Sequence, residues 1–305
     1  MSAMSKTIEI LFRIAGVSKP LKPRAFYKKL RKNAITYKRG ERVPRRVSGV
    51  RAEKSVYCGM VYYTFVPNHI DSASSVLYLY GSGYLNAHKR AQEKFAAEIA
   101  KNVHVKVFFP IYPKLPICAA VSAEAVLNNF YRFLQKQGAV CLAGDSSGAA
   151  LCLILSQGKR EANKIVAISP WLDAELSGVG ADEQKKDSFL SADRLRYVAK
   201  LWAYDLPLDS PKISPAAGDY EGKEILLFCG ENEIFLPSVR SFYKRYEKDK
   251  SVRVEYFEGK DQPHDYPLLP TREGAEARKI IFDALVRFLY GKTAIAEDLK
   301  GDMRP

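Results

Sequence analysis

The sequence GDSSG at positions 144–148 decides the fold, because it lies between an apolar run at 140–143 and a small-residue run at 147–155. The first run predicts a short buried strand and the second predicts a helix. A serine in the sharp turn between such a strand and helix takes a strained backbone geometry that projects its hydroxyl above the sheet. Ser146 is therefore a candidate nucleophile. The backbone N–H of Ser147, at the start of the helix, is placed to stabilise an oxyanion.

Short apolar runs alternate with longer amphipathic stretches on both sides of this turn. This βαβ rhythm predicts an α/β fold with a mostly parallel central sheet and helices on both faces. A segment at 172–218 interrupts the rhythm, and we expect it to form a helical cap over the strand ends together with the N-terminal region. We expect strands at 55–66, 76–80, 103–109, 140–143, 165–169, 225–229 and 252–257, and helices at 91–100, 119–137, 147–155, 192–204, 236–248 and 271–289.

Composition bounds the class of protein. The 305 residues are 47% apolar and 27% charged, with 48 Lys and Arg against 34 Asp and Glu, which is a globular composition and excludes a disordered or fibrous chain. The sequence contains no uncharged apolar run long enough to span a membrane. The apolar stretch at 8–17 is interrupted by Glu9 and Arg13, so it does not resemble an export signal. We therefore expect a cytoplasmic protein.

The cysteines and histidines give no metal-binding pattern. We expect the five cysteines to be reduced thiols in the core, because their number is odd and no C-x-x-C pair occurs. The four histidines include no pair at helical ligand spacing, so we expect no metal site. The cysteines are Cys58, Cys118, Cys141, Cys152 and Cys229, and the histidines are His69, His88, His104 and His264.

Positive charge is concentrated at 19–54, which holds 14 Lys or Arg residues but only two acidic ones, Glu41 and Glu53. The favoured interpretation is an amphipathic helix whose basic side faces solvent. Its apolar side would consist of Tyr27, Leu30, Ala34, Ile35 and Tyr37. The alternative is an electrostatic patch for an anionic membrane surface, a nucleic acid or an acidic substrate. Nucleic acid is the weakest of these partners, because no nucleic-acid-binding motif accompanies the charge.

A nucleophilic serine needs a base and an acid, which follow it along the chain in this type of fold. His264 is the only histidine after Ser146, and it lies in a polar turn after the last expected strand. The acid should follow the penultimate strand, where Glu231 and Glu233 are one and three residues after Gly230. We favour Glu233, because it has room to turn inward and orient the imidazole.

The backbone amides of the stretch YGSGY at 80–84 follow the third strand and can supply donors for an oxyanion. We expect Ser82 and Gly83 to donate to it together with Ser147.

Together these stretches resemble the hormone-sensitive-lipase-like group of the α/β-hydrolase fold. That group carries H-G-G-G and an aromatic, G-D-S-A-G, S-P-W-x-D, G-x-x-D/E and H-x-F/Y. The matching positions here are 80–84, 144–148, 169–173, 230–233 and 264–266. The resemblance implies an esterase for short or medium acyl esters that needs no cofactor, carries a cap and often dimerises.

Three positions depart from the family pattern. Tyr80 replaces the motif's histidine, Ser82 replaces a glycine, and Ser147 replaces the usual alanine. The serine at 82 narrows the space above the nucleophile and restricts the loop. We expect Trp171 and Asp173 of the S-P-W-x-D stretch to be structural.

The leading hypothesis is a serine carboxylesterase that works through an acyl-enzyme. Alternatives are an amidase or arylformamidase, a catalytically silent ligand-binding protein, and an esterase that docks on membranes through its basic segment. Tyr84, Phe189 and Trp202 are candidates for the pocket lining. The expected domain organisation is a basic N-terminal cap segment (1–54), a hydrolase core (55–292) and a polar tail (293–305).

Overall fold

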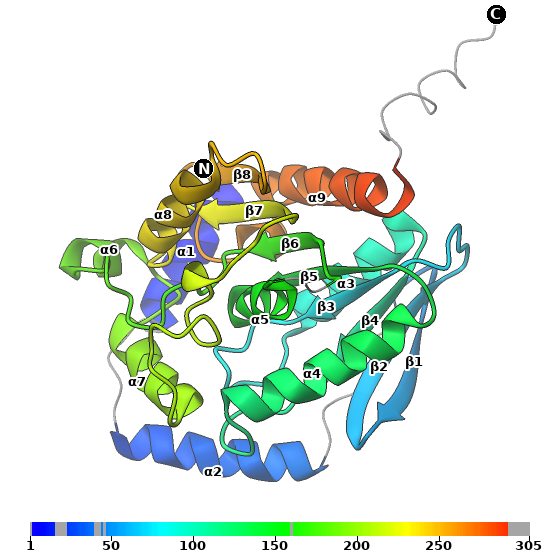
Figure 1. Ribbon diagram of the computed structural model, residues 1–305. Coiled ribbons are helices and arrows are strands. Elements are labelled where there is room, and N and C mark those ends of the chain that lie inside the picture. Colours follow the sequence, from blue (N-terminus) through cyan, green and yellow to red (C-terminus); the bar gives the residue numbers. More distant parts are fainter. Residues whose placement is uncertain (1, 16–22, 40–43, 45–46, 159–160, 292–305) are drawn as a thin grey trace, which may run out of the picture.

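An eight-stranded sheet forms the centre of the protein in the computed structural model, which describes residues 2–15, 23–39, 44, 47–158 and 161–291 (Figure 1). The spatial order of the strands is β1-β2-β4-β3-β5-β6-β7-β8. Strands β1 and β2 run antiparallel to their neighbours, and all other pairs are parallel, so the expected mostly parallel sheet is confirmed. The strands are β1 (Val50–Tyr57), β2 (Met60–Pro67), β3 (Ser75–Leu79), β4 (Lys106–Pro110), β5 (Val140–Asp145), β6 (Lys164–Ile168), β7 (Glu224–Gly230) and β8 (Arg253–Gly259).

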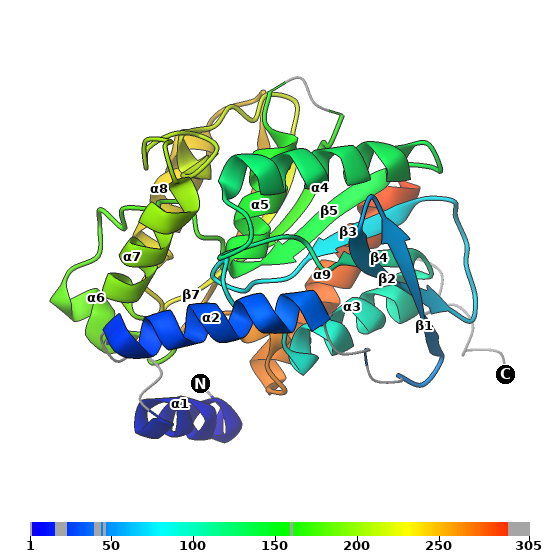
Figure 2. The ribbon, with the colours of Figure 1, turned by 90° about the horizontal axis from the view of Figure 1, so that it is seen from below.

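Helices cover both faces of the sheet (Figures 1 and 2). Helices α3 (Arg90–Val103) and α9 (Arg272–Tyr290) pack against each other on one face. On the other face lie α4 (Ala120–Gln135), α5 (Ser146–Ser156) and α8 (Leu236–Tyr246). Every residue of β3 and β5 is buried, as a parallel sheet covered on both sides requires. Of the helices in the described part of the chain, none combines the length and the apolar character needed to cross a membrane.

The single strand expected at 55–66 is wrong, because the structure forms a hairpin there. Strands β1 and β2 pair antiparallel, with Tyr57 opposite Met60. Cys58 and Gly59 make the turn with φ angles of 46° and 81°. A two-residue turn with two positive φ angles matches the twist of a hairpin, but it normally uses Asn-Gly, and Cys-Gly does not give that signal. Cys58 is exposed in this turn, so the expectation of five core thiols is wrong at this position.

The N-terminal region forms two helices, of which only the second was expected. Helix α1 (Ala3–Ala15) lies near the loop after β8, where the Ser5 hydroxyl donates to Gln262 Oε1 at 3.1 Å. The helix expected in the basic segment is α2 (Pro23–Arg39).

The buried face of α2 differs from the expectation. Phe26 is buried and Leu30 packs against the core, whereas Tyr27 and Ile35 are 57% and 53% exposed. The contact face is rotated because Phe26 inserts against Tyr197 of the cap, with ring centroids 5.0 Å apart. The Tyr37 side chain and the rest of the basic segment at 40–43 and 45–46 lie outside the described residues.

The segment at 172–218 contains α6 (Ala181–Lys186), α7 (Ala192–Ala203) and a 3-10 turn (Pro215–Ala217). Helix α2 meets α7 near its own N-terminal end, where Phe26 contacts Tyr197 (Figure 2). Strand β1 begins at Val50, before the expected start of the core at residue 55. The tail predicted at 293–305 lies outside the described residues.

Candidate active site

Ser146 occupies the sharp turn between β5 and α5 that the sequence predicts. Its φ is 52°, a strained value for a residue with a side chain. The two glycines permit this turn because the chain passes close to β3. A Cβ on Gly144 would lie 2.7 Å from the Leu79 carbonyl oxygen, and one on Gly148 would lie 2.7 Å from the Tyr80 carbonyl carbon.

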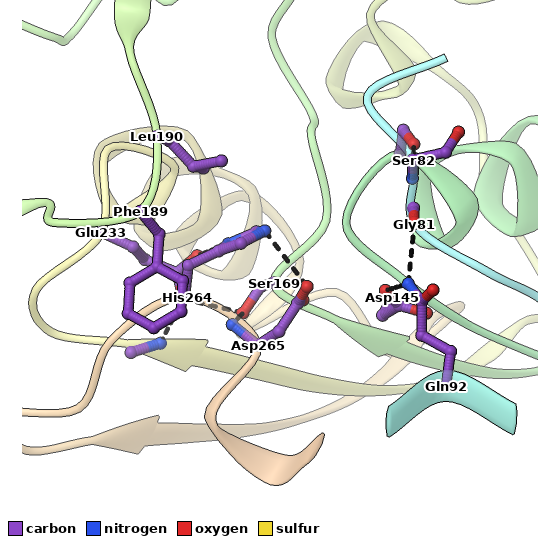
Figure 3. A network of polar contacts seen from close by, with 12 residues as sticks. Gly81, Ser82, Gln92, Asp145, Ser169, Phe189, Leu190, Glu233, His264 and Asp265 are labelled. Carbon is purple, nitrogen blue, oxygen red and sulfur yellow. Dashed lines mark hydrogen bonds and ion pairs between the residues drawn. The ribbon is translucent and has the colours of Figure 1, made fainter. Parts of the chain in front are cut away.

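Glu233 and His264 meet as the sequence predicts. The Nδ1–H of His264 donates to Oε2 of Glu233 at 2.7 Å, and both side chains are buried (Figure 3). The other carboxylate oxygen of Glu233 accepts from the Ser169 hydroxyl at 2.8 Å and from the Gly230 amide. The alternative acid, Glu231, instead accepts from the Asp261 amide at 2.9 Å. The structure therefore brings Glu233, and not Glu231, to the imidazole.

The second nitrogen of His264 faces an acid that sequence reasoning missed. Its Nε2 lies 3.3 Å from Oδ2 of Asp265, and no hydrogen bond joins it to Ser146 among the described residues (Figure 3). Ser146 and His264 do line the same cavity. Hydrogen bonds between a nucleophile and its base are often long without substrate, so this geometry is compatible with proton transfer once a substrate is bound.

The charges around His264 favour its protonated form. Burial lowers its pKa, but the charges of Asp265 and Glu233 and the hydrogen bond to Glu233 outweigh burial and raise the pKa to about 9. Burial also raises the pKa of Asp265. A general base must be neutral to accept a proton. The neutral imidazole of His264 therefore becomes abundant only at alkaline pH.

Ser169 connects the acid and the histidine loop. Besides donating to Glu233, its hydroxyl accepts from the Asp265 amide at 3.1 Å. Ser169 begins the S-P-W-x-D stretch, whose Trp171 stacks on Tyr84 and Phe235 in the core. Asp173 accepts two backbone hydrogen bonds in the next turn, so the stretch has the structural contacts that the sequence predicts.

One of the amides expected to bind the oxyanion already has a hydrogen-bond partner. The Ser82 amide donates to the Ser147 hydroxyl at 3.0 Å. Ser147 is the second residue of α5, so its own amide has no carbonyl partner inside the helix. Gly83 turns the loop with a φ of 54°. The Ser147 hydroxyl therefore engages the Ser82 amide, which the usual alanine could not do.

Gln92, which sequence reasoning also missed, braces the same loop. Its side-chain nitrogen donates to the Gly81 carbonyl at 2.7 Å and to Oδ2 of Asp145 at 2.6 Å (Figure 3). The Tyr78 hydroxyl donates to the other oxygen of Asp145 at 2.5 Å. Asp145 is fully buried, so these donors satisfy a carboxylate that directly precedes Ser146.

Tyr80 is the first residue of the 80–84 stretch and occupies the position of the family's histidine. Its hydroxyl accepts from the buried Lys114 ammonium group at 2.5 Å, and its carbonyl accepts from the Tyr112 hydroxyl at 2.7 Å. Its ring stacks on Phe109 with centroids 5.2 Å apart. A tyrosine can therefore anchor this strand end without the histidine.

A cavity of about 280 Å³ opens above Ser146 and reaches His264, Asp265 and the oxyanion loop. Of the three expected lining residues, Phe189 borders this cavity. Tyr84 and Trp202 are buried instead and stack on each other with centroids 4.3 Å apart. Within the described residues, no group of three His, Cys, Asp or Glu side chains is placed to hold a metal ion.

The fold and the site define a carboxylic ester hydrolase with a serine elbow, and comparisons with known proteins agree. Residues 76–268 match the family model described as the alpha/beta hydrolase fold, and the chain belongs to this family. An acetyl-hydrolase from Streptomyces hygroscopicus is 28% identical over 290 residues, covering 86% of this chain and 93% of that protein.

Solved structures of the same fold extend this agreement. A Staphylococcus aureus protein proposed to be an esterase has a TM-score of 0.78 at 27% identity, covering 85% of this chain and 90% of its own. An esterase of the bacterial hormone-sensitive lipase family has a TM-score of 0.77 at 20% identity, covering 94% of this chain and 98% of its own. The expected fold and the expected class of enzyme are thus confirmed.

Proposed function

We propose that the protein is a serine carboxylesterase that hydrolyses short- to medium-chain acyl esters through an acyl-enzyme. The contact between His264 and Glu233 beside a cavity that also holds Ser146 is the observation that carries this proposal. A buried glutamate on Nδ1 fixes the tautomer whose Nε2 can accept a proton. The cavity volume of about 280 Å³ suits a small substrate.

In the proposed reaction the Ser146 oxygen attacks the ester carbonyl while His264 Nε2 takes the hydroxyl proton. The carbonyl oxygen becomes an oxyanion that the amides of Gly83 and Ser147 stabilise, joined by the Ser82 amide when it leaves the Ser147 hydroxyl. Collapse of the intermediate breaks the bond to the alkoxide, which receives the proton from His264, and leaves the acyl group on Ser146. Water then attacks this ester, again with His264 as base, and releases the acid and the free serine.

The test is hydrolysis of p-nitrophenyl esters of rising acyl length by the wild type, Ser146→Ala and Ser156→Ala. Ser156 is the last residue of the same helix, and its buried hydroxyl donates a hydrogen bond to the Leu153 carbonyl. Ser156→Ala is therefore a matched control for the loss of a buried serine hydroxyl. We expect Ser146→Ala to lose kcat by roughly 10⁴-fold or more, and Ser156→Ala to keep it. Retained hydrolysis in the folded Ser146→Ala protein would refute the proposal.

A further inference from the structure

Three cations border the cavity above Ser146. Lys29 comes from α2, Lys89 directly precedes α3, and Arg194 lies in the first turn of α7. Among the described residues, no carboxylate forms an ion pair with any of the three. Among the described residues that line the cavity, Asp265 is the one carboxylate, whereas Lys29, Lys89, Arg194 and His264 are basic.

The packing of α2 directs Lys29 toward the cavity. Phe26 anchors the helix on Tyr197 of α7, and the Asn33 side chain donates at 2.6 Å to the carbonyl of Leu85, the residue directly after the 80–84 stretch. Residues 26, 29 and 33 share one helix face because they are three and four positions apart. Lys29 therefore lies between two fixed contacts, and its half-buried side chain borders the cavity that also contains Ser146.

The three charges act against one another. Burial, together with the charges of Arg194 and Lys89, lowers the pKa of Lys29 to about 8. Burial also lowers the pKa of Arg194. Like charges in one cavity oppose folding, so a purely structural role for this cluster is unfavourable. An arrangement that costs stability at a site is typical of a function that the site performs.

We propose that the natural substrate is an ester that bears an anionic group, a carboxylate in the first instance, and that Lys29, Lys89 and Arg194 bind this group. The inference rests on the proposed esterase function and names its substrate class. Charge-assisted hydrogen bonds to a carboxylate are about twice as strong as neutral ones, and a guanidinium can bind it with two donors. Apolar side chains on the α7 side of the cavity, Leu190, Leu195 and Val198, leave room for the uncharged part of the substrate.

The test compares matched neutral and anionic esters. For the acyl side, the pair is mono-p-nitrophenyl adipate and p-nitrophenyl hexanoate, which have six-carbon chains and the same leaving group. For the alcohol side, the pair is p-carboxyphenyl acetate and p-carbamoylphenyl acetate, each corrected for its alkaline hydrolysis rate. We expect kcat/KM to favour the anionic ester by about tenfold in at least one pair, and to lose this preference at high salt.

Two variants and one control test whether the cavity cations cause the preference for anionic esters. Lys29→Met and Arg194→Gln should each lower the anionic-to-neutral ratio of kcat/KM by about fivefold to tenfold. Lys28→Met is the matched control, because Lys28 is exposed on the same helix and does not border the cavity, and it should leave the ratio unchanged. Lys29→Met should also raise Tm, because it removes a repelled charge, whereas a structural lysine would lower Tm when replaced.

The outcomes separate the two proposals. Hydrolysis of both neutral esters without any preference for their anionic partners would overturn this inference and leave the esterase intact. A preference that survives in Lys29→Met and Arg194→Gln would also overturn it, because the binding group would then lie elsewhere. No hydrolysis of any ester by the folded wild type would refute the proposed function, and the substrate inference with it.

Discussion

In the proposed reaction the Ser147 hydroxyl makes the Ser82 amide less available to the oxyanion, and replacing Ser147 by alanine should therefore speed hydrolysis. The Ser82 amide donates to this hydroxyl at 3.0 Å, and both residues are buried. To donate to an oxyanion, the amide has to leave the hydroxyl. Breaking one neutral buried hydrogen bond costs about 1 kcal/mol. Since each 1.36 kcal/mol is tenfold in rate, Ser147→Ala should raise kcat about fivefold.

The assay is kcat for p-nitrophenyl butyrate at saturation, measured beside a urea unfolding curve. Ser147→Ala leaves the Ser82 amide without a partner in the free enzyme, so the free energy of unfolding should fall by about 1–3 kcal/mol. Ser156→Ala at the other end of α5 controls for loss of a buried hydroxyl. An unchanged or lower kcat in the folded Ser147→Ala protein would show that the Ser82 amide does not serve the oxyanion or that the hydroxyl does not compete for it.

Three further variants probe the acid, the neighbouring carboxylate and the oxyanion loop. Glu233→Gln should lower kcat by roughly 10²–10⁴-fold, because the glutamine amide neither fixes the His264 tautomer nor stabilises the protonated imidazole. Steady-state kinetics measured together with an unchanged Tm would separate this loss of catalysis from misfolding. Asp265→Asn removes one of the charges that raise the pKa of His264 to about 9, so the rise of kcat/KM with pH should shift toward neutral pH. An unshifted pH profile would contradict the assignment of His264 as the general base. Gly81→Ala should abolish activity, because its Cβ would lie 2.7 Å from the Ser146 Cβ; full kcat in a soluble variant would argue against this close approach.

Much of the central sheet could be predicted from sequence because its strands are buried on both faces. Such strands are continuous apolar runs, and the intervening helices have a clear period. The elbow at Ser146 followed from glycines on both sides of a serine between strand and helix. The pairing of Glu233 with His264 followed from chain order, since strand ends of a parallel sheet meet at one edge.

The contacts that set the chemistry could not be predicted in the same way. Asp265 lies against His264 because the backbone of Asp265 is in the left-handed region, with a φ of 56°. The hydrophobic periodicity of a sequence does not predict that a single residue adopts this conformation. The hydrogen bond between Ser82 and Ser147 joins the loop after β3 to the first turn of α5, and the two residues are distant in sequence. The direction of Lys29 depends on how α2 packs on α7, and the sequence indicated an amphipathic helix without its contact face.

The central claim is that Ser146 is the nucleophile of this site. Its most direct test is to treat the wild type with a fluorophosphonate probe and to map the modified peptide by mass spectrometry, with Ser146→Ala as the control. We expect one adduct, on the peptide that contains the sequence GDSSG, and none in the variant. An adduct on another residue, or no adduct on the folded wild type, would contradict the account.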